Sequence, residues 1–159
     1  MPEERTGAGA NADAEETKPY VIFKLGDEEF GVGMMNIKEI IKIPTITRVP
    51  HSADFIEGVI NLRGSLATVI NLRKRFDLEH KEIDADSRII IAEFEDNPVG
   101  MLVDAAEVLM ISVTDIDATA KNVTAEISKE YQMGVGKIEN RQIILLDLKQ
   151  VLAKEEGGG

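Results

Sequence analysis

The strongest constraint on the fold is an alternating segment from Phe55 to Phe76, which has the sequence FIEGVINLRGSLATVINLRKRF. Apolar residues recur at every second position in both halves, as they do in β-strands. Arg63 and Gly64 interrupt the alternation, and glycine tolerates the positive φ that a hairpin loop of about three to five residues usually needs. Asn71 is a suitable cap for a short helix beginning near Leu72. The segment therefore predicts a β-hairpin with a helical tail.

A weaker copy of this segment lies in the second half of the chain. Residues 57–76 can be placed on residues 133–152 without a gap, and the matches fall on turn, cap and core positions together. The matched positions are Gly58 with Gly134, Gly64 with Asn140, Val69-Ile70 with Leu145-Leu146, and Asn71 with Asp147. Arg63 meets Glu139, so the two hairpins carry opposite charges there. Upstream, Phe30-Gly31-Val32 matches Val99-Gly100-Met101, and Glu39-Ile40 matches Glu107-Val108. These correspondences predict an internal repeat.

Strand patterns dominate the rest of the chain. They cover residues 20–25, 29–33, 88–94, 99–103 and 109–113, while 35–43 fits a helical turn or a strand. Short helices are expected at 72–76 and from 148 to about 155. The predicted fold class is all-β with a few short helices, in two small β-barrel subdomains of about five strands each. We expect the two units, related by the internal repeat, to share an apolar seam with a groove beside it.

The domain boundaries follow from polarity. Residues 1–18 are acidic and rich in small residues, which predicts a disordered arm. Residues 19–153 are expected to form one domain whose two subdomains divide near 80–87, with an exchange of strands between them left open. Residues 154–159 are expected to be a flexible end.

The composition narrows the class of partner. The net charge is −11, whereas binding to nucleic acid or to an anionic membrane surface requires clustered Lys and Arg. The absence of cysteine excludes disulfides and thiolate chemistry and fits a reducing cytoplasm. No apolar run approaches the length of a membrane-spanning helix. We therefore expect a cytoplasmic protein that binds other proteins, with no nucleic-acid binding and no membrane insertion.

No motif indicates catalysis. The two histidines, His51 and His80, lie in polar loop segments and lack the spacing of a metal site. No P-loop, dinucleotide fingerprint or nucleophile elbow occurs, so we expect no enzyme activity, no metal and no cofactor. An adaptor that binds proteins is the first hypothesis, and a stand-alone β-barrel domain that binds a small ligand is the alternative. Few aromatic residues argue against a third class, an oligonucleotide-binding barrel.

Charged residues within apolar segments are the candidate contact sites. Arg63, at the predicted hairpin tip, is either an exposed turn residue or an interface anchor of the kind that arginine often provides. Glu39 stands alone among isoleucines and fits a surface carboxylate or a partner contact. The cluster Arg73-Lys74-Arg75 is interpreted as basic charge near a helix C-terminus, favoured by the helix dipole. Met34 and Met35 are expected to fill the core.

Several of these stretches together resemble the CheW-like domain family, which contains the coupling proteins of bacterial and archaeal chemotaxis. The resemblance extends from about Tyr20 to Leu152 and rests on GDEEFGVGMMNIKEII, TRVP, FIEGVINLRGSLATVINLRKRF, VGMLVD and LLDLKQVL. The same motifs occur in the regulatory domain of the histidine kinase CheA, but this sequence shows no receiver, ATP-binding domain or phosphotransfer bundle. The resemblance therefore implies a stand-alone coupling protein built from two SH3-like, five-stranded barrels.

The resemblance also implies partners and contact residues. It implies a non-enzymatic adaptor between the cytoplasmic tips of methyl-accepting chemoreceptors and the CheA regulatory domain. Such an adaptor would work at receptor arrays on the inner face of the membrane and be a monomer in isolation. The implied contact residues are Arg63, Gly58 and Leu66 for the receptor, Ile37 and Glu39 for the kinase, and Asn122 and Val123 for ring contacts. Thr68 and Asn71 stand where the family often has Pro and Asp, and Asn122-Val123 stands where an aromatic is common.

Overall fold

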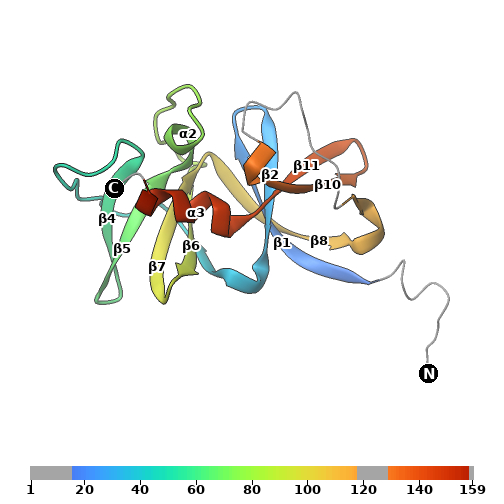
Figure 1. Cartoon of the computed structure of the whole chain (residues 1–159), viewed down its shortest axis with the longest axis horizontal. Coiled ribbons are helices and arrows are strands. Elements are labelled where there is room, and N and C mark those ends of the chain that lie inside the picture. Colours follow the sequence, from blue (N-terminus) through green and yellow to red (C-terminus); the bar gives the residue numbers. More distant parts are fainter. Residues whose placement is uncertain (1–15, 118–128, 158–159) are drawn as a thin grey trace.

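Two β-sheets lie side by side in the computed structural model, which describes residues 16–117 and 129–157 (Figure 1). Sheet 1 has the strand order β8 (Ala105–Ser112), β1 (Thr17–Leu25), β2 (Glu28–Gly33), β11 (Arg141–Leu146), β10 (Gln132–Ile138) and β9 (Ile116–Asp117). Sheet 2 has the order β3 (Ile37–Ile41), β6 (Arg88–Phe94), β7 (Asn97–Val103), β5 (Ser65–Asn71) and β4 (Ile56–Leu62). We call the units built on these sheets subdomain 1 and subdomain 2.

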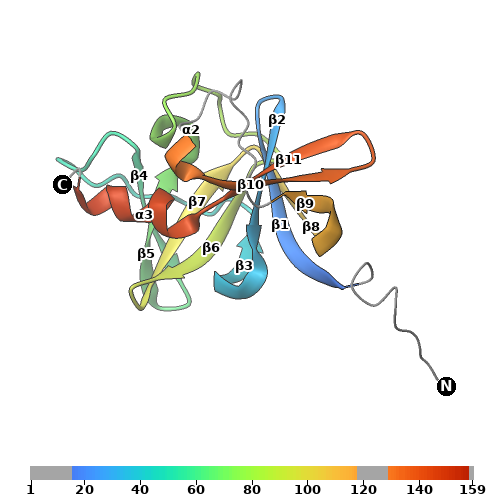
Figure 2. The same cartoon turned by 45° about the vertical axis from the view of Figure 1, so that its right-hand side comes forward.

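Short helical segments connect and cover the strands. They are η1 (Met34–Asn36), α2 (Leu72–Arg75), η2 (Val113–Asp115), η3 (Lys129–Tyr131) and α3 (Leu148–Gly157). In Figures 1 and 2, α3 leaves subdomain 1 after β11 and runs across to subdomain 2. The mostly-β fold class with SH3-like subdomains is therefore confirmed.

The internal repeat is visible in the topology of the two sheets. The order β8-β1-β2-β11-β10 in sheet 1 corresponds to β3-β6-β7-β5-β4 in sheet 2. Each sheet contains one parallel pair in the same register, with Leu145 opposite Gly31 and Val69 opposite Gly100. The sequence repeat aligns Val69 with Leu145 and Gly31 with Gly100, so the two parallel pairs are equivalent.

The subdomains exchange one strand each, so the boundary predicted at 80–87 is wrong. The chain crosses from sheet 1 to sheet 2 at η1 and returns at Asp104, between β7 and β8. Residues 80–87 instead connect α2 to β6 within subdomain 2. Their polar composition is typical of a surface loop. A surface loop within one subdomain has the same composition as a linker between two subdomains, so composition alone does not distinguish them.

The central hairpin is tighter than the sequence suggested. Leu62 pairs with Ser65, so the loop contains two residues and not three to five. Both loop residues have positive φ, 51° at Arg63 and 90° at Gly64, as a type I′ turn requires. Asn71 caps α2 as predicted, since its side chain accepts hydrogen bonds from the backbone N–H groups of Arg73 and Lys74.

Three clusters of buried apolar residues form the core. One lies within subdomain 2 and includes Ile60, Val69 and Ile89, and one lies within subdomain 1 and includes Ile22 and Ile143. The largest is the predicted seam between the subdomains. A chain of aromatic rings runs through it, with centroid distances of 5.6 Å for Phe23–Phe30, 6.2 Å for Phe30–Phe76 and 5.2 Å for Phe76–Tyr131. Strands facing two of these clusters are apolar on both faces, which explains the continuous run in β6.

Both ends of the domain are longer than predicted. Thr17 and Lys18, assigned to the disordered arm, pair with Ser112 and Ile111 as the first residues of β1. Helix α3 continues to Gly157, beyond the predicted helix end near residue 155 and the predicted domain end at residue 153. Residues 1–15 lie outside the described residues. Met35, predicted to fill the core, is 94% exposed on η1. Within the described ranges, no helix is long and apolar enough to cross a bilayer.

Candidate binding surfaces

The structure brings Arg63 and Glu39 together. The Arg63 guanidinium at the β4–β5 turn forms a salt bridge with the Glu39 carboxylate on β3, through Nη2 and Oε2. A second contact from Nη1 to Oε1 measures 3.4 Å. The Arg63 side chain is 72% exposed, so the pair lies at the surface and not in a closed core. The hydrogen bond from Arg63 is the main reason that the pKa of Glu39 falls below its usual value.

This pair joins the two ends of sheet 2. β3 and β4 are its edge strands, so a contact between β3 and the β4–β5 turn requires the sheet to coil until its edges approach. Subdomain 1 repeats the arrangement: Arg141 of β11 bonds Glu29 at 2.5 Å and Glu107 of β8 at 2.8 Å. Glu107 is the residue that the sequence repeat aligned with Glu39. The acidic residues Glu39 and Glu107 thus occupy equivalent positions, whereas Arg141 aligns with Ser65 and not with Arg63.

A depression lined by both apolar and polar residues lies at the surface of subdomain 2, near Leu66. Its volume is about 440 Å³, and Leu66 is 68% exposed. The lining residues are Ile56, Leu66, Thr68, Phe94, Glu95, Asn97, Pro98 and Val99. Arg63 does not line it, although it lies in the turn at the end of the same hairpin. The depression can accept an apolar side chain, and its surroundings can supply hydrogen bonds.

Gly58 has a structural task at the start of the hairpin. Its φ is 152°, and a Cβ atom there would lie 2.3 Å from the carbonyl oxygen of Thr47. The absence of a side chain lets residues 44–55 pack against β4, where Thr47 and Val59 exchange backbone hydrogen bonds of 2.8 and 2.9 Å. Gly134 has the same conformation in the second hairpin, with φ of 154°. Gly58 is buried and therefore shapes the surface without contributing a side chain to it.

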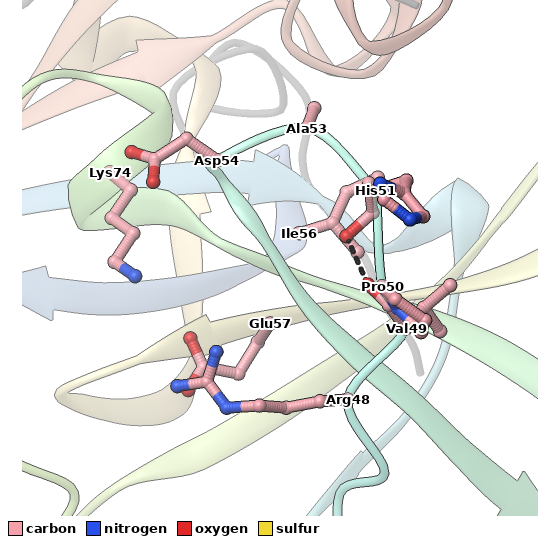
Figure 3. A pocket seen from close by; sticks show the side chains of 10 residues that line it. Arg48, Val49, Pro50, His51, Ala53, Asp54, Ile56, Glu57 and Lys74 are labelled. Atoms are coloured by element: carbon pink, nitrogen blue, oxygen red, sulfur yellow. Dashed lines mark hydrogen bonds between the residues drawn. The ribbon is translucent and has the colours of Figure 1, made fainter.

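The segment 44–55 forms a second depression, of about 420 Å³, shown in Figure 3. Arg48, Asp54, Glu57 and Lys74 place two positive and two negative groups around it. The mixed charge gives no preference for an anion or a cation. Among the described residues, no group of three or more acidic or imidazole side chains could hold a metal ion.

Of the remaining predicted contact residues, some are described by the structure and some are not. Ile37 is half-buried on β3 and packs against the seam cluster. Asn122 and Val123 lie outside the described residues. The five predicted residues that are described, Ile37, Glu39, Gly58, Arg63 and Leu66, all belong to subdomain 2. Because Arg63 and Glu39 form a salt bridge, the two predicted surfaces adjoin each other.

Sequence reasoning missed the role of Arg73. It was interpreted as one of three basic residues favoured by the helix dipole, but its guanidinium contacts the Asp104 carboxylate at 2.5 and 3.0 Å. Burial would raise the pKa of Asp104, yet hydrogen bonds from Arg73 and from the Gly26 N–H hold that pKa below its usual value. An acidic residue directly after the buried strand β7 was the available signal.

Two coiled β-barrels with surface depressions and exposed ion pairs are compatible with a protein of the binding-scaffold class. The comparisons specify the family. The family model described as a CheW-like domain matches residues 19–156, and the chain belongs to this family.

Named relatives agree with this assignment. The chain is 33% identical to the chemotaxis protein CheW of Klebsiella aerogenes, over 86% of this chain and 82% of that protein. It is 31% identical to CheW of Helicobacter pylori, over 96% and 92% of the two chains. It is 36% identical to CheW of Thermotoga maritima, over 89% and 91%.

A solved structure gives the same result. The scaffolding protein TtCheW from Thermoanaerobacter tengcongensis superposes with a TM-score of 0.76 and 34% identity, over 86% of this chain and 88% of that one. The chain is thus a chemotaxis coupling adaptor, and these findings do not support the small-ligand alternative.

Proposed function

We propose that this adaptor couples the cytoplasmic tips of chemoreceptors to the regulatory domain of the histidine kinase CheA, without catalysing a reaction itself. It would act in the cytoplasm, at receptor arrays on the inner face of the membrane. The relatives with chemotaxis names and the solved scaffolding protein support this proposal. The described surface offers binding groups, namely exposed apolar side chains and ion pairs.

The receptor surface of this proposal is the β4–β5 hairpin. Leu66 presents an exposed apolar side chain beside the depression of about 440 Å³. Receptor tips are helical hairpins, and a helix can insert one apolar side chain into such a depression while its polar neighbours reach the rim. Arg63 supplies the charge at the end of the hairpin. Gly58 acts indirectly, because it allows segment 44–55 to support β4.

The kinase surface of this proposal is the edge strand β3, with Ile37 and Glu39. In the described part of the chain β3 is an edge strand that pairs with β6, and its residue Glu39 forms its ion pair at the surface. Glu39 provides the charge that selects an oppositely charged group, and Ile37 provides apolar contact next to it.

The observation that carries the proposal is the exposed Arg63–Glu39 salt bridge. It connects the proposed receptor residue Arg63, in the β4–β5 turn, with the proposed kinase residue Glu39, on the opposite edge strand β3 of the same sheet. The salt bridge holds the two charged groups next to each other, so substitution of one residue would change the surroundings of the other.

A charge exchange tests this arrangement. We expect Arg63→Glu to lower receptor affinity by roughly tenfold, as loss of an interface arginine often does. Glu39→Lys should weaken kinase binding similarly and also reduce receptor binding, because Arg63 loses its partner. The double variant Arg63→Glu/Glu39→Arg should restore a salt bridge between the two positions but not the contacts with the receptor and the kinase. Titration calorimetry with each partner alone measures both affinities.

Glu93→Lys is the matched control. Glu93 is an exposed acidic residue on β6 in a 3.8 Å ion pair with Lys38. It should leave both affinities within about twofold of the parent, since Glu93 is not one of the proposed contact residues. Unchanged receptor affinity in Arg63→Glu, with circular dichroism like the parent, would exclude the β4–β5 hairpin as the receptor surface.

A further inference from the structure

Helix α2 lies between the subdomains and sends an arginine to each side of the seam. It follows β5, so it belongs to subdomain 2, and its three basic residues are consecutive. Arg73 and Arg75 are partly buried, and each contacts groups that belong to, or lead into, subdomain 1. These contacts are long-range in sequence and are not needed to build either sheet.

The Arg73 contact is centred on the point where the chain returns to subdomain 1. Arg73 Nε and Nη2 donate to the Asp104 carboxylate at 3.0 and 2.5 Å, and both side chains are less than a fifth exposed. The same carboxylate accepts from the Gly26 N–H, in the β1–β2 turn, at 2.8 Å. The Asp104 N–H donates to Lys24 of β1 at 3.0 Å. Asp104 therefore connects α2 to the β1–β2 hairpin of subdomain 1.

The Arg75 contact lies at the other side of α2. Arg75 Nε donates to the carbonyl oxygen of Val151 on α3 at 3.1 Å. Its guanidinium carbon lies 5.1 Å from the centroid of the Phe55 ring and 5.2 Å from that of Tyr131, at cation–π distance. Tyr131 precedes β10 of subdomain 1, so this contact also spans the seam.

We propose that α2 is a clamp that fixes the orientation of the two subdomains, with Arg73 and Asp104 as its positioning residues. The hydrophobic stabilisation of the seam is non-directional, whereas a bidentate guanidinium–carboxylate pair adds a contact with a defined geometry. Rotation of one subdomain against the other would break the Arg73–Asp104 pair and separate Arg75 from Tyr131.

The clamp has a consequence for binding that rests on the proposed function. Ile37, on the proposed kinase surface, packs against the seam cluster. β3 is also the strand that subdomain 2 receives directly after the crossing at η1. A released clamp would therefore loosen the support of Ile37, while the receptor residue Leu66, at the far end of β5, would keep its surroundings.

The experiment measures the distance between the subdomains in the full chain. Because the sequence has no cysteine, spin labels can be attached at Ser65→Cys in subdomain 2 and Lys137→Cys in subdomain 1, both exposed. Pulsed electron resonance on the parent should give one narrow distance distribution. We expect the Arg73→Gln and Asp104→Asn variants to show a broader distribution of distances between the two labels. The Gly26 amide should also lose protection from hydrogen exchange in these variants.

Arg141→Gln is the matched control, because Arg141 also forms ion pairs with carboxylates, those of Glu29 and Glu107, but only within subdomain 1. It should retain the narrow distribution. Arg73→Lys, which keeps the charge but not the bidentate geometry, provides a milder variant if Arg73→Gln does not fold. A narrow, parent-like distribution in a folded Arg73 or Asp104 variant overturns the clamp, and so does equal broadening in Arg141→Gln.

Titration with the CheA regulatory domain is a separate arm. Weaker kinase binding with unchanged receptor binding in Asp104→Asn is the expected result. Failure of the parent to bind the kinase domain would refute the proposed function, while the distance distributions would still decide whether the clamp exists.

Discussion

At the scale of single residues, the two hairpin glycines show how the sequence encodes the shape of a surface. Gly58 and Gly134 occupy equivalent positions, have nearly the same φ, and each coincides with a register shift in its hairpin. The pairing of these glycines could be predicted from sequence. The contact that makes Gly58 necessary could not, because Thr47 reaches it only after segment 44–55 has folded back onto β4.

Gly58→Ala should destabilise the domain. The new Cβ would overlap the Thr47 carbonyl oxygen in a backbone region that L-residues avoid, so we expect a loss of about 2–4 kcal/mol. Gly33→Ala is the control, since φ is −64° there and no atom lies within 4 Å of the added Cβ. Urea denaturation measures both, and a loss in Gly58→Ala no larger than in Gly33→Ala would contradict the packing described here.

Asn71 caps α2 and also bonds Glu57, whose Oε1 accepts from Asn71 Nδ2 at 3.1 Å. Asn71→Ala should cost about 1 kcal/mol of stability through loss of the cap. Asn71→Asp keeps the capping oxygen but places two carboxylates together, so it should also be destabilising, and Glu57→Gln should relieve that effect. Thermal denaturation of the three variants checks this; a deficit that persists in Asn71→Asp/Glu57→Gln would point to a cause other than repulsion.

At the scale of elements, the β4–β5 hairpin was predicted correctly as a hairpin but with too long a loop. Arginine has no special preference for positive φ, so nothing in the local sequence required Arg63 to join Gly64 in the turn. Its partner Glu39 lies on another strand, 24 residues away, and was assigned to a different surface. The sequence predicts the two residues separately, and the coiling of sheet 2 brings them into contact.

The turn and the charge of Arg63 can be separated. Arg63→Asn should keep the stability of the parent within about 0.5 kcal/mol, because asparagine accepts left-handed geometry. Arg63→Val should be less stable by about 1–2 kcal/mol, because a β-branched residue does not accept it. Urea midpoints of the two variants distinguish the effects; equal midpoints would mean that the turn tolerates any residue.

At the scale of the whole molecule, the repeat was predictable and the strand exchange was not. The repeat appears in sequence because turns, caps and core positions recur. Which sheet receives β3 or β8 depends instead on packing across the seam, and both choices have the same local pattern. The Arg73–Asp104 pair was equally hidden, since it forms only when both subdomains are in place.

The stability of the molecule should depend on pH through Asp104. Its pKa is 3.8 in the unfolded chain and lower in the native state, so the native state favours the carboxylate. The contribution is complete above about pH 4 to 5 and is lost as the pH falls through the native pKa. The stability difference between the parent and Asp104→Asn should be constant from about pH 7 to 5 and shrink toward pH 3. Urea denaturation across this range measures it, and a difference unchanged at pH 3 would mean that the charge is not its source.

An adaptor must hold two partners at once, and the proposed receptor and kinase surfaces adjoin each other on subdomain 2. Sedimentation velocity of the chain with a receptor cytoplasmic fragment and the CheA regulatory domain tests whether both can bind. A ternary complex heavier than either binary complex is the predicted result. Binary complexes only, with each partner displacing the other, would contradict the coupling function.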